Sequence, residues 1–167
     1  MKEIQSDVSW DELFMKHVYL IASKSKDPRT KIGAVLVKDG IIISEGYNGF
    51  ARGVRDLEER YSDSTIKYAF VVHAEANGVL NAVRHGINTS GATCFTQMIP
   101  CSECAKILIQ AGIQEIVVHS RWVYKNPQWE KAMKITKIMC GEAGVVIRDF
   151  DKFLSIQTLA DGRIISV

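Results

Sequence analysis

Cysteine, long apolar runs and excess charge are all scarce in this sequence of 167 residues. Its four cysteines are too few for the disulfide framework of a small secreted protein. No apolar run approaches the ~18 to 20 residues of a membrane-spanning helix, and the polar, acidic start at Met1–Trp10 is unlike a signal peptide. We therefore expect a soluble protein of a reducing compartment, in which the cysteines serve another purpose.

The charges nearly cancel, because the sequence has 21 Lys and Arg residues and 19 Asp and Glu residues, which give a formal net charge of +2. Proteins that bind along nucleic-acid phosphates are usually far more basic, so neither a nucleic acid nor a membrane is an expected partner. The sequence also lacks repeats, flexible linkers and charge blocks. With 47% hydrophobic residues, residues 1–167 are expected to form a single domain with a substantial core.

The hydrophobic pattern predicts a helix, a hairpin and then alternating helices and strands. An apolar stripe indicates a helix over residues 11–25. Two β-branched runs joined by Asp39-Gly40 indicate a hairpin, whose second strand is expected to run into a glycine-rich loop at residues 46–49. The other predicted elements are helices at 56–61, 74–85, 102–111 and 126–143, and strands at 92–97, 115–120 and 145–150. This order predicts an α/β fold in which helices cover both faces of one mixed sheet.

Two short motifs place metal-ligand side chains at predicted helix starts. His73 opens one helix, and Cys101 and Cys104 lie three residues apart at the start of another. Residues three apart face the same side of a helical turn, and the positive end of the helix dipole favours thiolates. Because zinc prefers thiolates and neutral imidazole as ligands, the sequence predicts that these three residues bind Zn²⁺.

The number of ligands indicates a catalytic zinc. A structural site is closed by four Cys or His ligands, whereas a catalytic site leaves its fourth position to water. No second Cys-x-x-Cys closes this site, and Cys94 and Cys140 are interpreted as small core residues. Glu75, two residues after His73, is placed to take a proton from that water. The alternative is a buried histidine with two packed cysteines and no metal, and it requires Glu75 and Pro100 to fall into place by chance.

The order H-x-E and then P-C-x-x-C is the signature of zinc deaminases. From about Leu13 to Phe150 the sequence resembles one family of them, the deoxycytidylate (dCMP) deaminases. Asn126, Pro127 and Trp129 are similar to some viral members. The motifs that carry the resemblance are Ser23–Pro28 (SKSKDP), Ile32–Val35 (IGAV), Gly46–Gly53 (GYNGFARG), His73–Asn77 (HAEAN), Pro100–Lys106 (PCSECAK) and Gln110–Ile113 (QAGI).

The resemblance implies a three-layer α/β/α sandwich around a mixed five-stranded sheet, as in cytidine deaminases. It implies hydrolysis of dCMP to dUMP and ammonia in the supply of dTTP precursors, in the cytoplasm, or in the host cytoplasm for a viral protein. By resemblance, water would attack C4 of the base at the zinc site, and Glu75 would protonate N3 and then the leaving amine. The backbone N–H of Ala74 would bind the base carbonyl, and Asn48 would contact the deoxyribose.

The resemblance also implies a homo-oligomer, commonly a hexamer, that dCTP activates and dTTP inhibits, usually with Mg²⁺ on the triphosphate. The candidate allosteric residues are Gly49, Arg52 and Arg84. The alternative for Arg84 is an ordinary cation at a helix C-terminus. Ala51 departs from the proline that the family usually has in its glycine-rich loop, and Gly78 departs from the usual alanine after H-A-E-x-N.

Four residues are candidates for holding the 5′-phosphate of the substrate. Ser25 and Lys26 precede the hairpin in a segment that matches the family, and the alternative is a solvated helix end. Arg121 and Tyr124 follow a predicted strand at the sheet edge where α/β proteins bind ligands, and the alternative is an exposed loop. Trp122 either lines the base or packs in the core.

Two other functions stay open at the level of sequence. A deaminase of tRNA or single-stranded nucleic acid shares the zinc chemistry but needs a basic, aromatic groove. The small net charge and the GYNG loop argue against it. A non-catalytic zinc module or nucleotide sensor is the third possibility, and the presence of Glu75 beside a three-ligand site argues against it.

Overall fold

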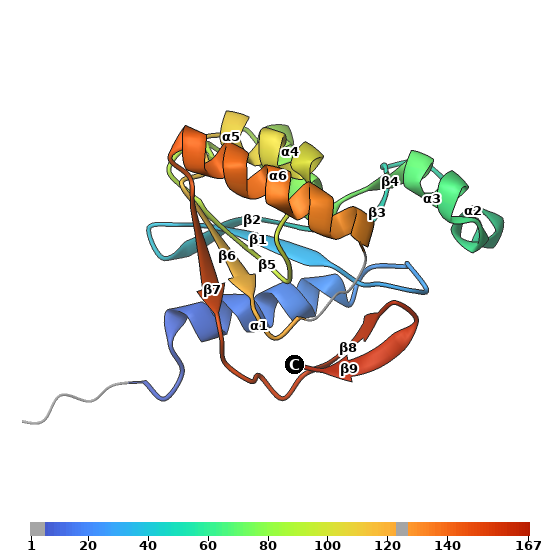
Figure 1. Ribbon diagram of the computed structural model, residues 1–167, viewed down its shortest axis with the longest axis horizontal. Coiled ribbons are helices and arrows are strands. Elements are labelled where there is room, and N and C mark those ends of the chain that lie inside the picture. The colour runs from blue at the N-terminus through green and yellow to red at the C-terminus, as the bar shows by residue number, and fades with distance from the viewer. Residues whose placement is uncertain (1–5, 123–126) are drawn as a thin grey trace, which may run out of the picture.

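The computed structural model describes residues 6–122 and 127–167. Its elements are α1 (Trp10–Ala22), β1 (Gly33–Lys38), β2 (Ile41–Tyr47), β3 (Gly49–Phe50), α2 (Glu58–Ser62), α3 (Ser64–Phe70), β4 (Val71–Val72), α4 (Ala74–Arg84), β5 (Thr93–Thr96), α5 (Ser102–Gln110), β6 (Glu115–His119), α6 (Pro127–Ala143), β7 (Val146–Phe150), β8 (Gln157–Ala160) and β9 (Arg163–Ser166). A five-stranded sheet in the order β2-β1-β5-β6-β7 forms the centre. One face carries α1 and the β8–β9 hairpin, and the other carries α4, α5 and α6 (Figure 1). The predicted three-layer sandwich with a mixed sheet is confirmed.

Strand pairing follows from local signals in the chain. Asp39 and Gly40 have φ angles of 53° and 74°, as required in the tight turn of a hairpin, and β1 pairs antiparallel with both β2 and β5. The strands β5, β6 and β7 are parallel and are connected through α5 and α6, as in other β-α-β units. Gly112 and Gly144, with φ of 76° and 73°, follow these helices where the sequence predicts their ends.

The central strands bury both of their faces, because successive side chains point to opposite sides of a sheet. In β1, Val35 belongs to a core cluster with α1, and Leu36 belongs to a second cluster with α4. Fully burying a side chain of this size stabilises the fold by ~1.5–3 kcal/mol. Cys94 and Cys140 are buried in the second cluster, as their interpretation as core residues predicts.

The expected loop at residues 46–49 is wrong in part, because Gly46 and Tyr47 continue β2 and Gly49 begins β3. Gly46 serves close packing rather than a turn. A Cβ atom at this position would lie 2.3 Å from the backbone N of Gly78 and 2.4 Å from the backbone O of Ala74. The absence of a side chain at Gly46 therefore lets β2 lie directly against α4, the helix that carries Glu75.

Several elements are not expected from the sequence. α3 begins after Asp63, whose carboxylate accepts hydrogen bonds from the backbone N–H groups of Thr65 and Ile66. β4 pairs with β3, and β8 pairs with β9 around Asp161-Gly162. This Asp-Gly pair is the same hairpin signal as Asp39-Gly40, so the sequence contained a clue to the second hairpin. Within the described ranges, no helix combines the length and apolar character that crossing a membrane requires.

Candidate active site

His73 and Glu75 enter the site from the start of α4. Because Gly49 of β3 pairs with Val72 of β4, the segment that contains Asn48 lies beside His73. His73 is the N-cap of α4, with an extended backbone (φ −70°, ψ 158°). Glu75 follows in the first turn, with only 4% of its surface exposed.

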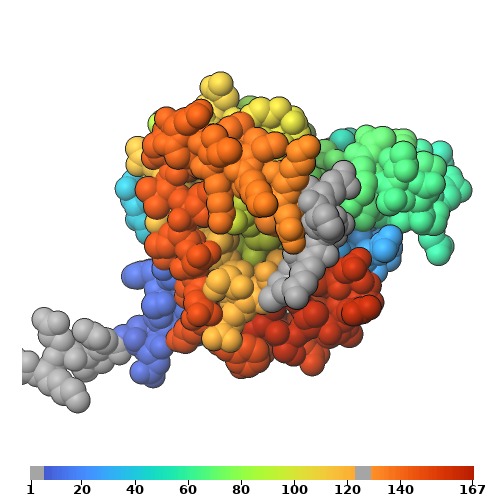
Figure 2. Space-filling view, in the orientation of Figure 1, coloured from blue at the N-terminus to red at the C-terminus, as the bar shows by residue number. Residues whose placement is uncertain are grey.

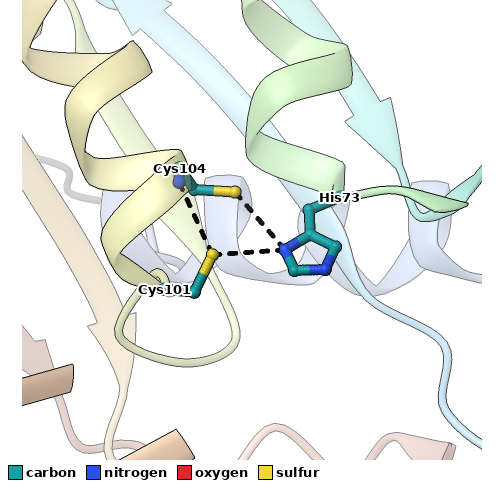
Figure 3. A group of neighbouring side chains, drawn as sticks. All are labelled: His73, Cys101 and Cys104. Atoms are coloured by element: carbon teal, nitrogen blue, oxygen red, sulfur yellow. Dashed lines mark hydrogen bonds between the residues drawn. The ribbon is translucent and has the colours of Figure 1, made fainter. Parts of the chain in front are cut away.

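Cys101 and Cys104 enter from the start of α5 in the same manner. Cys101 is the N-cap of α5, and its Sγ accepts a hydrogen bond from the backbone N–H of Cys104 at 3.5 Å. This bond satisfies one of the N–H groups that a helix start leaves unpaired. α4 and α5 pack against each other, so the two helix starts direct their side chains to one point (Figure 3).

The three side chains fit a zinc ion. His73 Nδ1 lies 3.4 Å from Cys101 Sγ and 3.5 Å from Cys104 Sγ, and all three atoms lie within 4.8 Å of one another. Zinc bonds of ~2.3 Å to sulfur and ~2.0 Å to nitrogen at tetrahedral angles place such atoms about 3.6 Å apart. The ligand atoms are therefore spaced as a tetrahedral metal centre with three protein ligands requires.

The surroundings of Cys101 favour its thiolate. The Cys104 thiol donates a hydrogen bond to it and the His73 ring interacts with it, which together lower the pKa of Cys101 to about 4. In turn, the hydrogen bond to Cys101 raises the pKa of His73. A thiolate is the form of cysteine that binds a metal, so these contacts suit Cys101 to the role of a metal ligand.

Glu75 has the environment of a carboxyl group that exchanges protons. Burial raises its pKa, and the nearby His73 ring opposes this shift in part. A carboxyl group with a raised pKa retains a proton more readily near neutral pH and returns it to a reacting group. Glu75 lines the same pocket as the metal cluster, so a molecule in that pocket reaches both.

The pocket above the cluster combines apolar and aromatic side chains with polar and charged groups, as small-molecule sites do. The Trp129 ring of α6 lies 5.6 Å from the His73 ring and 6.2 Å from the Tyr68 ring of α3. Ala74 and Asn48 also line the pocket, as their predicted roles require.

Residues 27–31, which we call the pocket loop, form one side of this pocket through Asp27 and Thr30. The side chain of Asn48 holds the loop in place. Its Nδ2 donates to the carbonyl oxygen of Thr30 at 2.9 Å, and its Oδ1 accepts from the N–H of Ile32 at 2.8 Å. Asn48 thus shapes the pocket as well as lining it.

Ser25 and Lys26 do not appear among the described residues that line the pocket. Ser25 is buried, and its hydroxyl donates to the backbone oxygen of Asn48 at 2.8 Å. Lys26 is exposed and forms an ion pair with Asp56 at 2.5 Å. In this conformation the serine supports the pocket wall, whereas the lysine lies outside it.

Arg121 is also exposed and pairs with Asp151 at 2.9 Å, away from the described pocket lining. Tyr124 lies outside the described residues. Trp122 is buried in the core cluster around α1, so the structure selects the core alternative for it. The aromatic ring beside the metal cluster is instead that of Trp129.

One of the three candidate allosteric residues, Arg52, contacts α4, the helix that ends at Arg84. Arg52 donates to Oδ1 of Asn81 at 2.7 Å, and Asn81 lies three residues before Arg84, on the same side of the helix. Gly49 lies apart from them in β3, where it pairs with Val72.

Sequence reasoning missed Asp27, Lys67 and Tyr68 as pocket residues. Lys67 and Asp27 are both buried, and Lys67 Nζ lies 3.0 Å from Asp27 Oδ2. The carboxylate also accepts hydrogen bonds from the backbone N–H groups of Arg29 and Thr30 at 2.8 and 3.1 Å. No local pattern marks a lysine that finds its partner 40 residues away.

Comparisons with known proteins agree with this site. The family described as cytidine and deoxycytidylate deaminase zinc-binding region matches residues 8–120. The chain is 34% identical over 151 residues to the deoxycytidylate deaminase of Mus musculus, across 86% of this chain and 80% of that protein. It is 33% identical to that of Homo sapiens over 151 residues, with the same coverage.

The fold is also that of a solved structure, dCMP deaminase from the cyanophage S-TIM5 in complex with dCMP and dUMP. The TM-score is 0.66 at 23% identity, across 89% of this chain and 100% of that chain. The region matched by the family contains His73, Glu75, Cys101 and Cys104. With its relatives above 30% identity and the shared fold, the chain belongs to the cytidine and deoxycytidylate deaminase family.

Proposed function

We propose that this protein is a zinc-dependent dCMP deaminase, which converts dCMP and water to dUMP and ammonia. The observation that carries the proposal is the three-ligand cluster of His73, Cys101 and Cys104 beside the buried Glu75. Three protein ligands leave the fourth tetrahedral position to water. The mouse and human relatives are deoxycytidylate deaminases, which favours dCMP among the substrates of the family.

Bound zinc supplies a Lewis acid that lowers the pKa of water. Glu75 accepts a proton from the attacking water, delivers it to N3 of the base, and later carries a proton to the amine. A C–O bond forms at C4, the C–N bond breaks, and ammonia leaves. The N–H of Ala74, at the first position of α4 and without a partner inside its helix, binds the base carbonyl.

The aromatic side chains of Trp129 and Tyr68 wall the pocket beside His73, which suits a flat pyrimidine ring. Asn48 lines the same pocket and is our candidate for contact with the deoxyribose. Ser25, Lys26, Arg121 and Tyr124 stay our candidates for the 5′-phosphate.

We further propose a cytoplasmic homo-oligomer, a hexamer as in related enzymes, that dCTP activates and dTTP inhibits, with Mg²⁺ on the triphosphate. Gly49, Arg52 and Arg84 are the candidate effector residues. The hydrogen bond from Arg52 to Asn81 supports a shared basic surface with Arg84 on α4.

The decisive test measures ammonia and dUMP formed from dCMP by the zinc-loaded protein and by Glu75→Ala. Removing a general acid–base group typically lowers the rate by about 10²- to 10⁴-fold. Glu103→Ala is the matched control, because Glu103 occupies the second position of α5 as Glu75 does in α4, but its side chain is exposed. Zinc-loaded wild-type protein that is inactive on both dCMP and dCTP contradicts the proposal.

A further inference from the structure

The β8–β9 hairpin touches the pocket loop at several points. The backbone N–H of Lys31 donates to the carbonyl oxygen of Leu159 at 3.0 Å. In the other direction, the N–H of Asp161 donates to Thr30 Oγ1 at 3.0 Å, and the N–H of Gly162 donates to the carbonyl oxygen of Arg29 at 2.7 Å. Segments about 130 residues apart therefore share a small hydrogen-bond network.

The turn of this hairpin directs its polar backbone at the loop. Asp161 and Gly162 have φ angles of 47° and 75°, the conformation of a tight two-residue hairpin turn. Both of their N–H groups donate to the pocket loop. The hairpin lies directly beside the loop after α1 (Figure 1), and its red surface adjoins a blue surface from the first quarter of the chain (Figure 2).

The hairpin is itself anchored in the core. Ala160 and Val167 are buried in the cluster around α1, together with Leu154 from the preceding segment. The N–H of Val167 donates to the carbonyl oxygen of Ile156 at 3.0 Å, and Val167 accepts from the N–H of Leu154 at 2.9 Å. The hairpin thus connects the pocket loop to the buried core around α1.

The pocket loop needs such support because it carries a buried charge. Asp27 is paired with Lys67 at 3.0 Å, with both side chains more than nine-tenths buried. A buried ion pair is favourable only while its geometry and additional hydrogen bonds are kept. A small outward shift of the loop would separate Asp27 from Lys67 and move Thr30 away from the pocket.

We propose that the β8–β9 hairpin is a positioning element for substrate binding, which holds the pocket loop against Asn48 and Lys67. This inference rests on the proposed function for its kinetic test. The hairpin lies outside residues 8–120, which match the family. It contributes no side chain to the described pocket lining, so it acts through Asp27 and Thr30.

The first test inserts two glycines between Asp161 and Gly162, which moves the turn away from the loop while both strands keep their residues. The matched control inserts two glycines between Asp39 and Gly40. This pair forms the same kind of turn, which joins β1 to β2. We expect the Asp161 insertion to raise KM for dCMP about 10-fold or more, because misplacement by about 1 Å is costly to a positioned site. The kcat and the zinc content of this variant should change by less than about 2-fold. The KM of the control insertion should also change by less than about 2-fold.

A point-substitution pair keeps the test decisive if the insertion disturbs folding. Gly162→Val and Gly40→Val both place a β-branched residue at a φ near 75°, with no atom within 4 Å of the new Cβ. Both substitutions strain the backbone equally, but only Gly162 contacts the pocket loop. A KM raised by Gly162→Val and not by Gly40→Val supports the inference. Equal effects of the two substitutions on KM overturn it.

Amide hydrogen exchange at Lys31 separates this inference from the proposed function. Faster exchange at Lys31 in the Asp161 insertion supports the hairpin as the support of the loop, and unchanged exchange contradicts it. If the wild-type protein fails to deaminate dCMP, the proposed function fails, but the exchange measurement still decides whether the hairpin holds the loop.

Discussion

The close backbone approach between Gly46 of β2 and the first turns of α4 makes a sharp prediction. In Gly46→Ala, the added Cβ would lie 2.3 Å from Gly78 N and 2.4 Å from Ala74 O. Both are backbone atoms, which cannot rotate away, so β2 and α4 must separate by about 1 Å to reach ordinary contact. Overpacking of a rigid site costs ~1–3 kcal/mol, and two backbone clashes place this substitution near ~3 kcal/mol.

The same displacement should reduce activity, because α4 carries Glu75 and begins at His73. A shift of about 1 Å in a catalytic group lowers the rate by up to about 100-fold. Urea unfolding followed by circular dichroism measures the stability of Gly46→Ala, and dUMP formation measures its kcat/KM.

Gly78→Ala is the matched control on the facing helix. Its Cβ would lie 3.7 Å from Leu36 Cγ, an ordinary contact, and alanine favours a helix by ~0.5–1 kcal/mol over glycine. We expect it to stabilise the protein slightly and to leave kcat/KM unchanged. An unfolding midpoint of Gly46→Ala equal to that of the wild type would refute the close-packing argument.

Three further outcomes follow from the structure. Lys67→Met should destabilise the fold by about 3 kcal/mol in urea unfolding, since it leaves the Asp27 carboxylate buried without its cation, whereas Lys106→Met on the exposed face of α5 should change stability by less than about 0.5 kcal/mol. Burial lowers the pKa of His119 below its usual value of 6.5, so the folded state favours the neutral ring. The stabilisation from the neutral His119 ring is fully present above pH ~6.5. It is lost as the pH falls below that value, because the unfolded chain binds the proton before the folded protein does. His119→Gln should therefore show a shallower loss of unfolding free energy between about pH 7 and pH 5, and equal slopes would contradict this assignment. Cys101→Ser should bind much less zinc by metal analysis, and activity lost on chelation should return with Zn²⁺ only in proteins that keep all three ligands.

Much of the metal site follows from local sequence, because both halves of it are helix starts. A residue at an N-cap and one in the following turn have nearly fixed relative positions, so Cys101 and Cys104 converge in any fold that forms α5. What the sequence alone does not determine is that α4 and α5 lie side by side. That depends on the order of strands in the sheet, which brings His73 to within 3.5 Å of both sulfur atoms.

The surroundings of the metal cluster are harder to predict, because they depend on contacts between distant parts of the chain. By sequence, Ser25 is either a phosphate ligand or part of a solvated helix end. In the structure it is instead buried, and its hydroxyl donates to the backbone oxygen of Asn48. The sequence offers Trp122 as a candidate to line the base, and only packing places it in the core and brings Trp129 to His73 instead.

By itself, the sequence determined the strands of the central sheet and the helices that cover it, and it predicted the three candidate zinc ligands and Glu75. Hydrophobic periodicity, turn residues and helix starts are properties of a few neighbouring residues, so they can be predicted from the sequence without the fold. Only the tertiary structure decided that Lys67 pairs with Asp27, that Gly46 allows β2 to approach α4, and that the β8–β9 hairpin supports the pocket loop. Each of these depends on residues brought together across 30 to 130 positions, where burial and backbone geometry select the partner and no local pattern records it.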